Sequence, residues 1–280
     1  MLKIYKSTKT PNVKTLINGQ KVAFYNKYYH NYSQSLVLTN ELSQIANLKD
    51  HINKNTKILT VLGSGEQPLF FKIYGAKDIF TFYISFTSYL LASLKISAIQ
   101  VLQTSDEYNV FINDLFTLKT IDELLKKTYL SMAVKNLSKE NQFYLQQTIK
   151  YKSTPFYRNS SCNLYSVNPE EFDILKRFSE TDTPFIWTDI SKLFKGIYHE
   201  KFDIIYYSNI LSFKHESMLR PVLESAKQHL SSNGKIFLTS EPFKTDQIQS
   251  AISDVFRTGY DTQLFEQQEY FHQIMIQHIH

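Results

Sequence analysis

The sequence predicts an α/β fold built on a mainly parallel β-sheet with an antiparallel C-terminal strand. Three observations support this prediction. Short apolar runs typical of buried strands recur along the 280 residues and alternate with helical segments, as in βαβ units. The first of these runs leads through a glycine-containing turn into a helix. The tail at 263–279 alternates apolar and polar residues, which predicts one or two terminal strands.

The N-terminal part of the chain predicts a helical extension followed by the first strands. Residues 22–50, including Leu36, carry apolar side chains at helical spacing. The elements expected next are a strand at 58–62, a helix at 67–74, a strand at 79–84 and a helix that ends near residue 102. Gly75 suits the left-handed position that ends a helix, and Ser85 or Thr87 can cap the second helix.

The middle of the chain interrupts this alternation. Residues 104–165 are interpreted as an insertion or cap, although 120–137 predict a helix. Asn168 can cap a helix that has Pro169 at its first position. The remaining expected elements are strands at 184–190, 202–210 and 234–240 and a helix at 216–230. We therefore predict a single Rossmann-like domain over 1–280, with a helical extension at 1–55 and an insertion at about 104–165.

Composition narrows the classes of function. The formal charge of +5 is spread along the chain without a dense Lys/Arg block, so we expect no nucleic-acid partner. The one cysteine excludes an internal disulfide and a cysteine-rich zinc site, and no histidine motif has metal-ligand spacing, so we expect no metal. Without a signal-peptide core or an uncharged span of 18 residues, we expect a cytoplasmic protein with no integral membrane segment.

The turn after the first strand is the main candidate for a ligand site, because ligands of parallel sheets bind beyond the carboxyl ends of the strands. It reads Gly63-Ser64-Gly65-Glu66-Gln67-Pro68. The P-loop motif is absent, and Pro68 stands where a dinucleotide fold has its third glycine, so NAD is disfavoured. A cofactor without phosphates fits the turn better. A plain strand-to-helix turn without a ligand stays open as the alternative.

Four segments carry a resemblance to a known family: AFYNKYYHNYSQSLVLTNEL, KILTVLGSGEQPLFFKIYGAKDIFTFYIS, LLASLKISAIQVL and FDIIYYSNIL. The chain resembles class I S-adenosylmethionine-dependent transferases. It is more closely similar to a family of unknown function related to S-adenosylmethionine:diacylglycerol 3-amino-3-carboxypropyltransferase. The likeness covers most of residues 22–240 and matches poorly over 110–165, and the LK pair after the second strand is a fairly specific mark of that family.

This resemblance implies a pocket for S-adenosylmethionine. Gly63, Ser64 and Gly65 would face its amino-acid end, and the tip of the second strand would face the ribose. The other residues that the resemblance implies are Asp189 for the adenine amino group, and Ser208 and Asn209 near the reacting group. Glu66 either acts on the amino-acid end of the ligand or complements the positive helix terminus.

Two positions depart from the pattern of similar enzymes. Val61 stands where many methyltransferases have an acid, and Tyr83 replaces the Asp that grips the ribose hydroxyls. A carboxylate contributes about 1.5–3 kcal/mol per charged hydrogen bond, whereas Tyr83 offers one phenolic oxygen or a stacking surface. We expect about tenfold to hundredfold weaker cofactor binding from this loss.

The candidate catalytic residues are Asn209, His215 and His30. His215 follows the segment SNILSFK and is a candidate base, while His30 lies in an aromatic segment whose other interpretation is packing of the N-terminal helix. The expected function is transfer of a 3-amino-3-carboxypropyl or methyl group to a small-molecule or lipid-like acceptor. The alternative is a non-catalytic Rossmann-like protein that binds S-adenosylmethionine or a partner through a degenerate site, and a weaker option is a nicotinamide oxidoreductase.

Overall fold

The computed structural model describes residues 2–4, 35–36, 39, 41–76, 78–83, 85–117, 126–151, 156–157, 165–181, 183–197, 199–267 and 271–278. The chain divides into two compact units. Unit 1 comprises residues 1–40, 62–73 and 83–187, and unit 2 comprises residues 41–61, 74–82 and 188–280. Within the described ranges, no helix combines the length and apolar character needed to cross a membrane.

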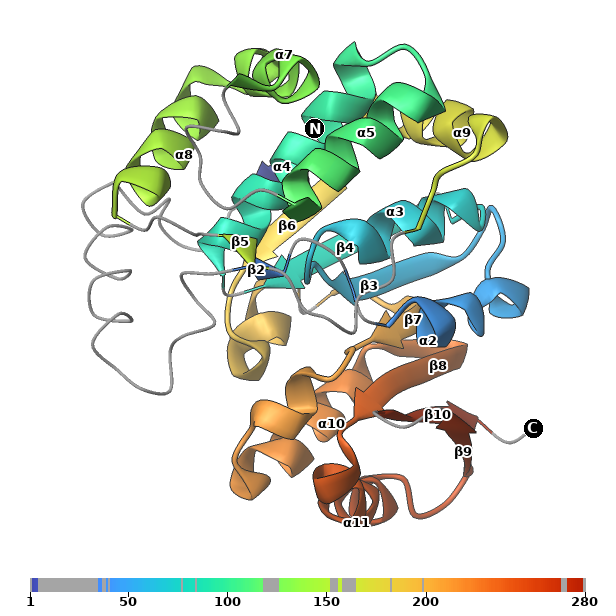
Figure 1. The fold of residues 1–280 in the computed structure, drawn as a ribbon. Coiled ribbons are helices and arrows are strands. Elements are labelled where there is room, and N and C mark those ends of the chain that lie inside the picture. The colour runs from blue at the N-terminus through green and yellow to red at the C-terminus, as the bar shows by residue number, and fades with distance from the viewer. Residues whose placement is uncertain are drawn as a thin grey trace. The chain divides into compact units, whose positions relative to one another are not determined.

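Unit 2 contains a mainly parallel sheet whose far end is antiparallel (Figure 1). Its strands, in spatial order, are β4 (Asp78–Tyr83), β3 (Lys57–Val61), β7 (Phe202–Tyr206), β8 (Leu230–Ser240), β10 (Phe271–His278) and β9 (Tyr260–Gln267). The pairs from β4 to β8 are parallel, β10 runs antiparallel to β8, and β9 runs antiparallel to β10. The predicted fold class, with its antiparallel C-terminal end, is confirmed.

The central strands form because their side chains are apolar on both faces. Ile58, Leu59 and Val61 of β3 are all buried, and β4 buries its residues 79–82 in the same way. Residue pairs Ile58↔Ile79 and Val61↔Phe82 set the parallel register. The sequence therefore placed these two neighbouring strands to within one residue at each end.

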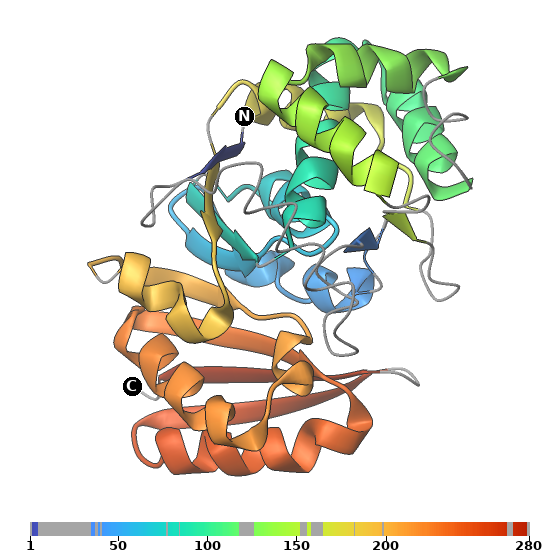
Figure 2. The ribbon, with the colours of Figure 1, turned by 90° about the vertical axis from the view of Figure 1, so that its left-hand side faces the viewer.

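Helices α10 (Glu216–Gln228) and α11 (Thr245–Val255) lie side by side along the strands of unit 2 (Figure 2). Short 3₁₀ helices follow the parallel strands: η3 (Ile190–Gly196), η4 (Ile210–Phe213) and η5 (Pro242–Lys244). At the start of the unit, α2 (Leu42–Ala46) and η2 (Lys49–His51) precede β3. The expected N-terminal helix is thus present at 42–46, and residues 22–34 lie outside the described part of the chain.

Unit 1 is mostly helical. Its elements are β1 (Leu2–Ile4), β2 (Ser35–Leu36), α3 (Glu66–Ile73), α4 (Phe86–Val101), α5 (Ser105–Thr117), α7 (Thr128–Asn136), α8 (Lys139–Tyr151), β5 (Phe156–Tyr157), α9 (Pro169–Ser179) and β6 (Thr183–Trp187). Strands β1 and β6 pair in parallel, as do β2 and β5. Leu36 therefore belongs to a strand, and the helix predicted for it is wrong because apolar spacing alone does not show that 156–157 supply a strand partner.

Helix α4 is the centre of the apolar core of unit 1. Helices α5, α7, α8 and α9 pack around it, so the described helices of the expected insertion contribute directly to this core (Figure 1). Ser85 caps α4 by accepting a hydrogen bond from the backbone N–H of Ser88. Asn168 caps α9 in a reciprocal arrangement with Glu171, with Pro169 at the first position, as the sequence predicted.

Candidate functional site

Both glycines of the turn after β3 adopt left-handed backbone conformations, with φ of 53° at Gly63 and 88° at Gly65. The N–H of Gly65 donates to the carbonyl of Leu62 at 2.7 Å, which closes the turn. A Cβ atom added at Gly65 would lie 2.7 Å from Cβ and 2.8 Å from Cα of Ala92 in α4. Gly65 is therefore required both by its backbone conformation and by the close approach of α4.

The side chain of Gln67 covers the other glycine. A Cβ atom added at Gly63 would lie 2.4 Å from Nε2 of Gln67. Gln67 is buried, and its Nε2 contacts Oγ1 of Thr39 at 3.4 Å, whereas its Oε1 has no hydrogen-bond partner within the described residues. An amide oxygen without a partner in a buried position is costly, so this side chain gains from any donor brought to the turn.

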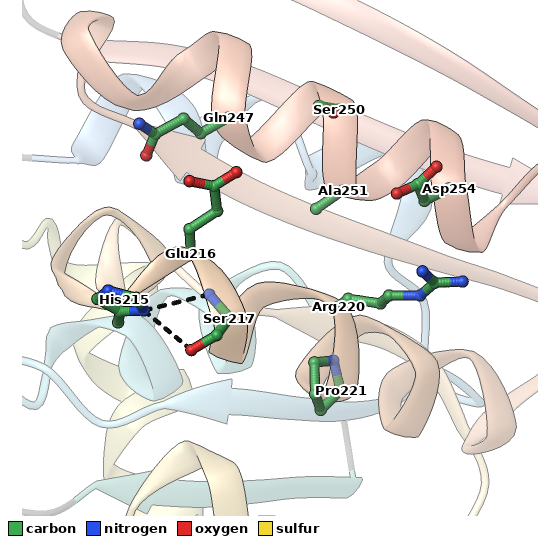
Figure 3. Close-up of a pocket in the computed structure, with 9 residues that line it drawn as sticks. All are labelled: His215, Glu216, Ser217, Arg220, Pro221, Gln247, Ser250, Ala251 and Asp254. Atoms are coloured by element: carbon green, nitrogen blue, oxygen red, sulfur yellow. Dashed lines mark hydrogen bonds between the residues drawn. The ribbon is translucent and has the colours of Figure 1, made fainter.

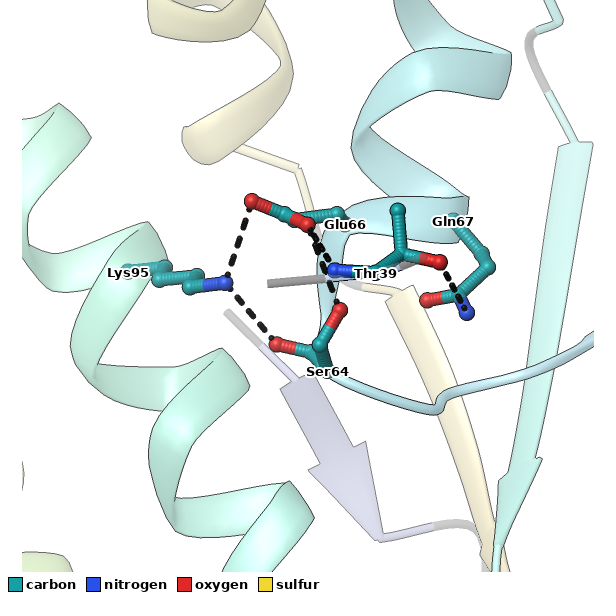
Figure 4. A network of polar contacts seen from close by, with 5 residues as sticks. All are labelled: Thr39, Ser64, Glu66, Gln67 and Lys95. Atoms are coloured by element: carbon teal, nitrogen blue, oxygen red, sulfur yellow. Dashed lines mark hydrogen bonds and ion pairs between the residues drawn. The ribbon is translucent and has the colours of Figure 1, made fainter. Parts of the chain in front are cut away.

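A buried polar network connects the turn with α4 (Figure 4). The backbone N–H of Thr39 donates to Oε2 of Glu66 at 2.6 Å, and the ammonium of Lys95 lies 3.4 Å from Oε1 of the same carboxylate. Lys95 also donates to the carbonyl of Ser64 at 3.0 Å, and the Ser64 hydroxyl lies 3.4 Å from Oε2 of Glu66. The network ties the turn to α4 and places a carboxylate at the first turn of α3, where the helix dipole favours negative charge.

Lys95 was not among the residues that the sequence singled out for the site. Its signal was available, because Lys95 is the only charged residue in the 16-residue apolar helix α4. A lysine with no exposed side-chain surface needs a partner, and the acid of the preceding turn is that partner. Tyr83, at the carboxyl end of β4, is partly buried, and its side chain packs against the apolar cluster of unit 1.

Asp189 lies in unit 2, two residues after the end of β6 at Trp187, although the sequence predicted a strand that continues to residue 190. It caps η3 by accepting from the N–H of Ser191 at 2.9 Å, and it forms an ion pair with Lys214 at 2.6 Å. Burial acts to raise the pKa of this carboxyl, but the hydrogen bonds from Lys214 and Ser191 and the charge of Lys214 outweigh burial, so the pKa is lowered. The carboxylate thus already has two donors within its own unit.

Ser208 and Asn209 follow β7, also in unit 2. Ser208 has a φ of 53°, and its hydroxyl donates to the carboxylate of Glu41, which also accepts from the Tyr206 hydroxyl at 3.1 Å. Glu41 is only 1% exposed, and burial raises its pKa despite these hydrogen bonds. Asn209 stands at the start of η4. Sequence reasoning missed Glu41, because nothing local marks an acid whose partner lies 167 positions away.

His215 caps α10 rather than standing alone in a pocket. Its Nδ1 accepts from the backbone N–H of Ser217 at 3.3 Å and contacts the Ser217 hydroxyl at 2.9 Å. The residue borders an open groove of about 540 Å³ between α10 and α11 (Figure 3). Across the groove lie polar side chains such as Gln247 and Asp254. His30 lies outside the described residues, within which no group of three or more His, Cys, Asp or Glu side chains could hold a metal ion.

Several solved structures are similar to this chain, although their sequences are not. No protein-family model matches the chain, and no curated protein matches it. Among solved structures, a ribosomal protein L11 methylase from Lactobacillus delbrueckii subsp. bulgaricus is 13% identical, with 86% of this chain and 80% of that chain covered and a TM-score of 0.45. An rRNA methylase from Streptococcus thermophilus is 8% identical, with 88% and 100% covered and a TM-score of 0.45.

A third similar structure covers more of this chain. The magnesium protoporphyrin IX methyltransferase from Synechocystis with bound S-adenosylmethionine is 10% identical, with 99% of this chain and 88% of that chain covered and a TM-score of 0.39. At these identities and TM-scores the likenesses assign neither a family nor an activity.

Proposed function

We propose that this protein binds S-adenosylmethionine at the glycine turn and transfers its methyl or 3-amino-3-carboxypropyl group to a small-molecule or lipid-like acceptor. The observation that carries this proposal is the turn itself. Two left-handed glycines follow the central strand β3, whose neighbour β4 runs parallel to it, and this arrangement suits close backbone approach to a ligand.

The charges at the turn favour a cofactor without phosphates. A pyrophosphate needs an excess of positive charge or free amides, but Lys95 is already paired with Glu66, and this pair carries no net charge. Pro68 in the first turn of α3 also has no N–H to offer. The methionine end of S-adenosylmethionine carries an ammonium, which can donate to the buried Oε1 of Gln67.

The chemistry needs little from the protein beyond alignment. S-adenosylmethionine, when bound, supplies an electrophilic carbon next to a sulfonium. The turn would fix the amino-acid end of the cofactor, and the resemblance implies that Asn209, which follows β7 in the sequence, has a role near the reacting group. Holding two reactants in line and excluding water provides most of the rate enhancement in such displacements, so no strong base is required when the acceptor is already nucleophilic. His215 could act as a base through Nδ1 only if it gave up the hydrogen bond by which it caps α10.

A second candidate is a protein that binds the cofactor or a partner without turnover. Three observations favour it: Tyr83 is partly buried against the apolar cluster of unit 1, Asp189 is paired with Lys214, and Gln67 covers Gly63. Each of these side chains would have to change its contacts to take the role that the resemblance implies. The two candidates therefore differ in whether binding leads to transfer.

Calorimetry with S-adenosylmethionine and S-adenosylhomocysteine tests the proposal directly. We expect wild-type binding to be weak, and Tyr83→Asp to tighten it by about tenfold to a hundredfold because a carboxylate restores charged hydrogen bonds. Tyr129→Asp, which alters another tyrosine partly buried against the same cluster, is the matched control. Absence of binding by both wild type and Tyr83→Asp would overturn the proposal.

Cofactor labelled separately at the methyl and aminobutyrate carbons distinguishes the reactions. Loss of the methyl label to an acceptor identifies a methyltransferase, and loss of the aminobutyrate label identifies aminocarboxypropyl transfer. Binding without loss of either label in cell extract favours the non-catalytic candidate. Binding of NADH in the same calorimetric experiment, without binding of S-adenosylmethionine, would instead support the oxidoreductase option.

A further inference from the structure

We propose that Glu41 is a positioning residue whose carboxylate holds Ser208, and with it the loop after β7, in a left-handed backbone conformation. Ser208 is the only non-glycine residue with positive φ in the described part of the chain, at 53°. This region is sterically unfavourable for a residue that has a Cβ atom, and such residues keep it only when their surroundings enforce it.

The contacts come from Glu41 and from strand β8. The hydroxyl of Ser208 donates to Oε2 of Glu41, and the Tyr206 hydroxyl donates to the same oxygen at 3.1 Å. On the other side, the backbone N–H of Thr239 in β8 donates to the carbonyl of Ser208 at 2.9 Å. Tyr207 is tied to β8 as well, because its N–H donates to the carbonyl of Phe237 at 2.9 Å. Glu41 is therefore the side-chain anchor of this loop.

Stability alone does not explain an acid at this position. Glu41 precedes α2, but its side chain makes no capping hydrogen bond to that five-residue helix. The Glu41 side chain is almost fully buried, and loss of its hydration opposes folding. The hydrogen bonds that it accepts must offset this cost. Tyr206 and Ser208, which donate hydrogen bonds to it, both lie at the carboxyl end of β7: Tyr206 is the last residue of the strand, and Ser208 follows two residues later. We infer that its role is to specify the conformation of that loop.

The conformation of Ser208 sets the direction of the chain that follows. Asn209 and η4 come directly after it, and the resemblance implies a role for Asn209 near the reacting group. If Ser208 relaxed to a right-handed conformation, the Asn209 side chain and the whole of η4 would turn away from their present positions. The effect on transfer therefore rests on the proposed function, whereas the effect on the loop does not.

Substitutions at Ser208 separate the hydroxyl contact from the backbone strain. Ser208→Ala and Ser208→Gly both remove the hydroxyl, but only alanine keeps a Cβ that disfavours the left-handed region. We expect hydrogen exchange at the amides of residues 207–211 to become about tenfold to a hundredfold faster in Ser208→Ala, and less so in Ser208→Gly. Equal exchange in the two variants would overturn the proposal, and so would wild-type exchange in both.

Substitution of Glu41 provides the second arm. Glu41→Ala should speed exchange in the loop as Ser208→Ala does, and adding Ser208→Gly to Glu41→Ala should recover part of the protection, since glycine adopts the conformation without an anchor. Glu41→Gln keeps an acceptor oxygen and should retain most of the protection. Glu224→Ala, which removes an exposed acid of α10, is the control. If the loop amides of the double variant exchange as fast as those of Glu41→Ala, the proposal is contradicted. If Glu41→Ala does not fold, the comparison of Ser208→Ala with Ser208→Gly still tests the proposal.

Transfer of the label from S-adenosylmethionine then tests the functional consequence. Glu41→Ala is expected to lower kcat by about tenfold or more with little change in KM for the cofactor, and the double variant is expected to recover part of kcat. A purely structural role would lower the fraction of folded enzyme and would not be relieved by glycine at 208. If the wild type transfers no label, the proposed function fails, while hydrogen exchange still reports on the Glu41 anchor.

Discussion

The ammonium of Lys95 lies 3.4 Å from the carboxylate of Glu66, and the lysine side chain has no exposed surface. Lys95 also donates to the carbonyl of Ser64 at 3.0 Å, so one side chain from α4 binds both the turn after β3 and the first residue of α3. A buried ion pair of this kind contributes little net stability compared with apolar residues, but losing one partner leaves an uncompensated charge. The turn therefore depends on both residues together.

Lys95→Met should lower the free energy of unfolding by about 3–5 kcal/mol, because the buried Glu66 carboxylate would lose its cation. Adding Glu66→Gln should recover part of that loss, since the remaining group is then neutral. Urea unfolding of the single and double variants measures both effects. The matched control is Arg220→Met, which breaks an exposed pair with Glu224 and should cost less than about 1 kcal/mol. Equal losses from Lys95→Met and Arg220→Met would contradict the argument.

Alanine substitutions at Gly75 and Gly65 distinguish the free-energy cost of an unfavourable backbone conformation from the cost of a steric clash. Gly75→Ala introduces a Cβ at a φ of 99°, with no atom of the described residues within 4 Å, so it should cost about 1 kcal/mol from the backbone conformation alone. Gly65→Ala adds to such strain a clash with Ala92 at 2.7 Å, and we expect a total of about 2–4 kcal/mol. Thermal or urea unfolding provides the comparison. If the two substitutions cost the same, α4 does not constrain the turn.

Much of the fold followed from local signals in the sequence. The apolar run at 58–62 predicted β3 because both faces of that strand are buried. The pattern at 263–279 predicted one or two terminal strands, and the structure has two, β9 and β10. The Asn168 cap and the Gly75 helix end have geometries that single residues specify. The strand predicted at 184–190 was too long, because Asp189 caps η3 and β6 ends at Trp187.

The site could be predicted less completely, because its contacts join distant parts of the chain. Glu41 meets Ser208 across 167 positions, and no local pattern links them. Lys95 and Ser64 are 31 positions apart, although a lone charge in an apolar helix pointed to a buried partner. The position of the Gln67 side chain over Gly63 depends on a rotamer that the sequence does not encode locally. The cofactor contacts assigned by resemblance remain predictions.

The raised pKa of Glu41 predicts a pH dependence of stability. The unfolded chain releases the proton of this carboxyl near its ordinary value of 4.5, whereas burial keeps the folded protein protonated to higher pH. Between these two values the folded state binds more protons, so the free energy of unfolding falls as pH rises, and it levels off above the folded pKa. Glu41→Gln removes this titration and should gain stability relative to wild type as pH rises above 4.5. Urea unfolding of both proteins across this range measures the difference, and a difference that does not vary with pH would contradict the prediction.

Gln67 predicts how the turn responds to a ligand. Its amide lies against Gly63, so a ligand that approaches the bare backbone of this glycine must first displace the side chain and its 3.4 Å contact with Thr39. Gln67→Ala removes this obstacle but also removes the Oε1 atom that would accept from the ammonium of S-adenosylmethionine, and we expect the cofactor to bind about threefold to tenfold more weakly in calorimetry because a hydrogen bond from a charged donor is lost. Gln100→Ala, in α4, is the control, because Gln100 bonds the carbonyl of Ser179. Tighter binding by Gln67→Ala would show instead that the amide only obstructs Gly63, and unchanged binding would place the ligand away from Gly63.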